Sequence, residues 1–215
     1  MGSCSNPASF ETARLPPDHS FNRPATAGVM NIGSTSSQGD PARAGRSIGA
    51  MFFAVFGGLW LELWANDQYP GSIVAVLIVV LLGAALLAAA IRVYQRNSGA
   101  LKSIAQTPET RRRSRYFNLI NGAQWIAIFV VAFTLAKTGL GTWILPSIML
   151  IVGLHFLPLA RLFGYRPRYV TGAALILLAI TYPLLAHDGP ASAFGALATG
   201  GILWLSAIVA ISPSV

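Results

Sequence analysis

Six long apolar segments constrain the fold of this chain more than any other feature of its sequence. About 20 apolar residues in a helix cross the roughly 30 Å hydrocarbon layer of a bilayer. Because lipid offers no partners to backbone N–H and C=O groups, each segment is predicted to be helical. The six segments cover approximately residues 47–65, 72–93, 117–136, 142–160, 169–186 and 191–211.

The composition favours the same class of protein. Only 10% of the 215 residues are charged, whereas a soluble domain typically carries about 25%. Very short connections link the first segment to the second, the third to the fourth and the fifth to the sixth. We therefore expect an all-α polytopic membrane bundle of six transmembrane helices, arranged as three antiparallel hairpins, over residues 46–213. Residues 1–45 are rich in Ser, Pro, Gly and Asn and lack hydrophobic periodicity, which predicts a disordered polar tail.

Basic residues collect on one side of the six segments. From Arg43 onward, twelve Lys or Arg residues lie just before the first segment or at the connections after the second and fourth, and the opposite side has only Lys137. Because Lys and Arg are retained on the cytoplasmic side, both termini are predicted to be cytoplasmic in a cell membrane. The net charge of +8 arises at the ends of apolar segments, so anionic lipid headgroups are expected as partners and nucleic acid is not.

The connection 94–116 contains a helix-start signal and a basic run. Thr107, Pro108 and Glu109 supply a capping hydroxyl, a proline for the first helical position and an acid near the positive helix end. The third helix can therefore begin near Pro108, before the apolar segment that starts at residue 117. Four arginines would then cross the headgroup layer as a topology anchor or anionic-lipid contact, namely Arg111, Arg112, Arg113 and Arg115.

One polar cluster is predicted inside the bundle. His155 precedes Arg161 by six residues, so it lies about 9 Å inside the cytoplasmic boundary. Asn121 follows Arg115 by the same interval, and Gln124 lies one turn deeper on the same face. Ser206 could enter this layer from the sixth helix. The cluster has two interpretations: hydrogen bonding between helices, or a ligand-binding or permeation site.

Two further residues bear on these interpretations. Pro158 cannot donate to the carbonyl of Leu154 and is predicted to kink the helix beside His155, as in the broken helices of transporters. Glu62 lies between Trp60 and Trp64, which predicts an interfacial acid that reaches water. If Glu62 faced the bundle instead, it would be a candidate entrance for a cation or a proton.

The stretch Val152-Gly-Leu-His-Phe-Leu-Pro-Leu-Ala160, following a helix that carries Asn121 and Gln124, resembles small multi-pass bacterial membrane proteins of unknown function. The resemblance covers roughly residues 47–212. It implies the six-helix architecture and no particular activity.

The sequence gives little support to catalysis. It has no Walker loop, paired-carboxylate site, His-Glu-x-x-His or Gly-x-Ser-x-Gly motif, and neither a cofactor nor a metal is expected. Three functions are considered: a non-enzymatic membrane subunit or scaffold, a small-solute or ion transporter with a polar site around His155, and, least favoured, an embedded enzyme. A homo-oligomer is compatible with each of them.

Overall fold

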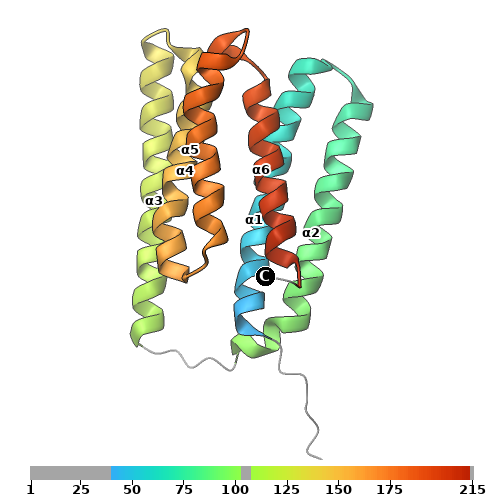
Figure 1. Cartoon of the computed structure of the whole chain (residues 1–215), viewed down its shortest axis with the longest axis vertical. Coiled ribbons are helices and arrows are strands. Elements are labelled where there is room, and N and C mark those ends of the chain that lie inside the picture. Colours follow the sequence, from blue (N-terminus) through green and yellow to red (C-terminus); the bar gives the residue numbers. More distant parts are fainter. Residues whose placement is uncertain (1–39, 103–107, 214–215) are drawn as a thin grey trace, which may run out of the picture. The chain divides into compact units, whose positions relative to one another are not determined.

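The computed structural model describes residues 40–102 and 108–213, and every regular element in these ranges is helical (Figure 1). Each of the six long helices is long and apolar enough to cross a membrane, which confirms the predicted fold class. Short 3₁₀ turns precede α4 and α6. The bounds are α1 Pro41–Gln68, α2 Ile73–Lys102, α3 Pro108–Lys137, η1 Gly141–Trp143, α4 Ile144–Phe163, α5 Pro167–Leu185, η2 Gly189–Ala191 and α6 Phe194–Ile211.

Helix α1 begins earlier than predicted. The Asp40 carboxylate accepts a 2.9 Å hydrogen bond from the N–H of Ala42, and Pro41 occupies the first turn, so the chain carries a helix-start signal ahead of its apolar segment. The N–H of Asp40 donates to Oδ1 of Asn97 at 3.0 Å, which ties this start to α2. The predicted tail, 1–45, is therefore wrong for its last residues, and its first 39 lie outside the described residues.

The predicted connection 94–116 is also mostly helical. Helix α2 continues to Lys102, and α3 starts at Pro108 with Glu109 in its first turn. The start near Pro108 is thus confirmed, so residue 117 begins the apolar segment and not the helix, whereas the predicted end of the second helix at residue 93 is wrong. The cause is that hydrophobicity marks the part of a helix that lies in lipid, while intrahelical hydrogen bonding continues into water.

The three predicted hairpins are present, since α1 packs on α2, α3 on α4 and α5 on α6. Contacts between α1 and α6 and between α4 and α5 are also extensive. The helices consequently form two groups, one of α1, α2 and α6 and one of α3, α4 and α5, with α6 packed against α5 across the junction (Figure 1). The start of α1 and the end of α6 lie at the same end of the bundle (Figure 1).

Two pairs of glycines set the closest approaches between helices. A Cβ atom added to Gly200 of α6 would lie 2.9 Å from the carbonyl oxygen of Gly57 on α1. A Cβ atom added to Gly172 of α5 would likewise lie 2.9 Å from the carbonyl oxygen of Gly153 on α4. Because lipid removes the hydrophobic drive for helix association, such close packing contributes much of the attraction between membrane helices.

Trp204 of α6 joins three helices. Its indole Nε1–H donates to the main-chain carbonyl of Ala54 on α1 at 3.0 Å. Its ring covers Gly57 and Gly58 of α1 and reaches Gly83 of α2, where an added Cβ would lie 3.4 Å away. The missing side chains of these glycines create the space that the indole fills.

The core between the two helix groups is mostly apolar. The rings of Phe53 on α1 and Phe156 on α4 meet edge to face, with centroids 5.3 Å apart. Around them lie buried side chains from α4, α5 and α6, including Met149, Leu175, Leu203 and Ala207. Helix α3 has no buried residue along its described length, so its apolar surface is available to lipid or to another membrane helix.

Candidate functional site

His155 lies on the face of α4 that is turned toward α3. Its imidazole interacts with the main chain of Ile120, one residue before Asn121. The ring is partly buried and meets Phe156 at a centroid distance of 5.8 Å. Nδ1 is buried and has no hydrogen-bond partner. The geometry brings His155 to the depth of Asn121, as the sequence predicted, but against the backbone of α3.

The amides of Asn121 and Gln124 do not complete a cluster around His155. Asn121 is exposed and Gln124 is partly buried. Within residues 108–213, no hydrogen bond joins either amide to the imidazole. The contact to His155 is made instead by the backbone of α3, which sequence spacing along the helix could not reveal.

Ser206 belongs to a different pair. Its Oγ lies 2.8 Å from Oγ1 of Thr171 on α5 and donates to the carbonyl of Ile202 at 2.7 Å. Thr171 is buried and was not considered from the sequence. The available signal was its position three residues after Arg168, near the same end of the bundle as Ser206. The prediction of one cluster containing His155, Asn121, Gln124 and Ser206 is therefore wrong: these residues separate into an α3–α4 contact and an α5–α6 contact.

Pro158 does not break its helix, since α4 is continuous from Ile144 to Phe163. Proline still removes one intrahelical bond, but the unwound segment typical of a transporter site is not found in α4. The geometric argument for a binding site beside His155 is weaker for that reason.

Glu62 is partly buried, and its Oε1 is buried without a hydrogen-bond partner. The adjacent Leu61 packs with Ala65 and with Val79 of α2. A buried carboxylate oxygen favours an inward-facing acid over the interfacial acid predicted from its flanking tryptophans. Burial of an unpaired charge is costly, so Glu62 is the candidate for proton or cation chemistry in this half of the bundle.

All four arginines of the run on α3 are exposed. The Nη2 of Arg112 donates to the hydroxyl of Tyr116 at 3.4 Å, with the guanidinium carbon 5.5 Å from the ring centroid. Pro108, Arg111, Arg112 and Arg115 line a surface hollow. These side chains have the exposure that contact with anionic headgroups requires. No group of three or more His, Cys, Asp or Glu residues suited to a metal lies within 40–102 and 108–213.

Comparison with known proteins adds no further assignment. No protein-family model, curated protein or solved structure matches this chain. The residues and contacts described above are therefore the basis for a functional proposal.

Proposed function

We propose that the chain is a non-enzymatic membrane subunit or scaffold of a cell membrane, with both termini cytoplasmic. One observation carries the proposal: polar side chains in the bundle are split between separate helix pairs. His155 meets the backbone of Ile120, and Ser206 meets Thr171. A permeation route would need polar groups that follow one another across the membrane, whereas these pairs are suited to fixing neighbouring helices.

The exposed surface of α3 supports the same proposal. Its outer face presents a continuous series of large side chains, including Trp125, Ile126, Phe129, Val130 and Phe133. Only α4 and its preceding turn make extensive contact with α3 among the described elements. A helix held by one neighbour has most of its surface free for a further membrane helix.

A transporter is the second candidate, and a specific observation favours it. Glu62 Oε1 and His155 Nδ1 are both buried without partners, and unpaired polar atoms in a membrane are costly unless they serve a purpose. In this alternative, Glu62 near one surface and His155 near the other would each handle a proton or cation.

Replacing His155 by alanine distinguishes the scaffold from the transporter. In the scaffold, His155→Ala is expected to lower the free energy of unfolding by about 1 kcal/mol, the usual size of a polar contact between membrane helices. Asn121→Ala, at an exposed position on the neighbouring helix, is the matched control and should change it by less than about 0.5 kcal/mol. Unfolding in mixed micelles of mild detergent and SDS measures both values.

Flux measurements complete this test. Liposomes containing the wild-type chain and a pH-sensitive dye should show no more proton flux under an imposed potential than protein-free liposomes. Flux that is present in the wild type and lost in both His155→Ala and Glu62→Gln would overturn the scaffold and establish the transporter. Extraction in mild detergent from the native membrane should also yield a complex heavier than the 22.8 kDa chain.

A further inference from the structure

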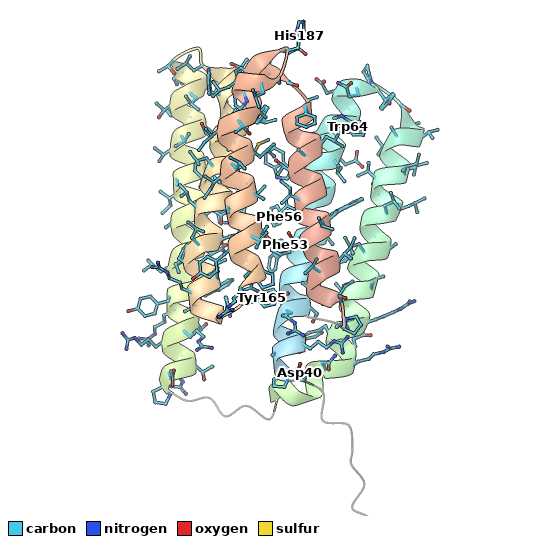
Figure 2. All side chains as sticks on the ribbon, viewed as in Figure 1. Asp40, Phe53, Phe56, Trp64, Tyr165 and His187 are labelled. Atoms are coloured by element: carbon cyan, nitrogen blue, oxygen red, sulfur yellow. The ribbon has the colours of Figure 1, made fainter. Side chains whose placement is uncertain are left out.

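Two arginines, Arg46 and Arg168, meet a tyrosine where α1 begins and the chain turns from α4 into α5, and a third arginine, Arg43, lies one helical turn from Arg46. Arg43 and Arg46 lie one turn apart on α1, and Arg168 lies in the first turn of α5. Tyr165 is in the connection between α4 and α5, and Figure 2 shows it at this end of the bundle. All four side chains are partly buried. We refer to these four residues as the arginine–tyrosine cluster.

Arg46 and Arg168 both lie over the ring of Tyr165. The guanidinium carbon of Arg46 lies 5.8 Å from the centroid of Tyr165, and that of Arg168 lies 5.9 Å from the same centroid. Arg168 also lies over Phe163 at 4.6 Å. Its Nη2 reaches α1, where a Cβ atom added to Gly49 would lie 3.0 Å away. Gly49 therefore gives the guanidinium room to approach the helix.

The cluster contains buried polar atoms that no other group satisfies. Arg43 Nε, Arg46 Nε, Arg168 Nη1 and Tyr165 Oη are each buried without a hydrogen-bond partner. Across the described part of the chain, no ion pair links these arginines to a carboxylate. The nearest acid in sequence, Asp40, uses its carboxylate to cap α1. Cations that converge without an anion repel one another, and unsatisfied buried donors are costly.

We propose that the arginine–tyrosine cluster binds a phosphate group at the cytoplasmic membrane surface. Guanidinium groups match the oxygens of phosphate with paired donors, and the Tyr165 hydroxyl adds another donor. Arg46 and Arg168 hold the phosphate, with Arg43 at the side toward the start of α1. The group comes from an anionic lipid headgroup, which is abundant at this surface, or from free phosphate.

Such a ligand would connect the two helix groups. Arg43 and Arg46 belong to the group of α1, α2 and α6, whereas Tyr165 and Arg168 belong to the group of α3, α4 and α5. A phosphate bound between them would add an ionic contact across the junction. This inference is independent of the scaffold proposal, because a transporter could use the same contact.

Titration of the delipidated, full-length protein in neutral detergent tests the site. The thermal midpoint, followed by tryptophan fluorescence, is measured with inorganic phosphate, with chloride at equal ionic strength, with short-chain phosphatidic acid and with short-chain phosphatidylcholine. Phosphatidic acid should raise the midpoint, and chloride and phosphatidylcholine should not. A matching rise with inorganic phosphate assigns a free-phosphate site, and its absence assigns a lipid headgroup site.

Variants identify the residues responsible. Arg168→Gln and Tyr165→Phe should each weaken the titrated affinity by about 10-fold, the usual effect of losing a hydrogen bond to a charged group. Arg96→Gln is the control, since it removes an exposed arginine at the same end of the bundle. Tyr165→Phe keeps the test valid if Arg168→Gln fails to fold. The proposal is overturned if neither phosphate probe raises the midpoint, or if Tyr165→Phe binds as tightly as Arg96→Gln.

Discussion

Replacing Trp204 by alanine is expected to lower the free energy of unfolding by about 3 kcal/mol, at the lower end of the range for deleting a large aromatic side chain. The lower end applies because transfer of the ring between lipid and protein contributes little, so the loss comes from packing. The substitution would empty the space over Gly57 and Gly83 and remove the hydrogen bond to Ala54. Unfolding in mixed micelles measures the change.

Two further substitutions identify the source of that loss. Trp204→Phe keeps most of the ring but removes the indole N–H, and it should cost about 1 kcal/mol. Trp125→Ala, on the outer face of α3, removes a tryptophan that is 42% exposed and should change stability by less than about 0.5 kcal/mol. Equal losses at Trp204 and Trp125 would contradict the three-helix contact described for Trp204.

The second large effect is expected at the crossing of α4 and α5. In Gly153→Ala, the new Cβ would lie 2.8 Å from Cγ1 of Ile176 and 3.0 Å from both the carbonyl oxygen of Gly172 and the N–H nitrogen of Ile176. The side chain of Ile176 can rotate, but the backbone atoms cannot yield without separating the helices. The expected loss is about 1–3 kcal/mol, the usual cost of overpacking.

Gly122→Ala on α3 is the matched control, because a Cβ atom there would meet no atom within 4 Å. At such a site, alanine is favoured over glycine in a helix by roughly 0.5–1 kcal/mol. The two substitutions should therefore change the free energy of unfolding in opposite directions. A stabilising effect of Gly153→Ala would show that α4 and α5 do not approach as closely as described.

The sequence predicted the number and approximate positions of the helices because bilayer thickness imposes a length on apolar segments. It did not predict where helices end outside lipid. Asp40 and Pro41 form a start signal for α1 in a region whose composition is typical of disorder. Lys102 ends α2 nine residues beyond the predicted boundary. Composition alone cannot separate a polar helix end from a loop.

The candidate site was predicted less well, for a geometric reason. Counting residues from the segment boundaries predicted the depth of His155 and Ser206 but not the direction of their side chains about the helix axis. His155 is turned toward α3 and Ser206 toward Thr171 on α5. The rotation of each helix about its axis is coupled to which of its glycines pack against a neighbouring helix, as Gly57 does with Gly200 and Gly153 with Gly172. A chain with 21 glycines offers many such pairings, so the sequence does not specify the rotation. The Trp204 contact was missed for the same reason.

Cysteine labelling in intact cells tests the transmembrane arrangement most directly, in a Cys4→Ser background that removes the single cysteine of the sequence. Asp67 is exposed in the last turn of α1, Asp188 is exposed in the connection after α5, and Arg96 is exposed near the end of α2. Figure 2 places His187, the neighbour of Asp188, at the end of the bundle opposite Asp40. An impermeant maleimide should label Asp67→Cys and Asp188→Cys in intact cells, and Arg96→Cys only after lysis. Labelling of all three positions before lysis, or of Arg96→Cys alone, would contradict a bundle that crosses the membrane six times with its arginines inside.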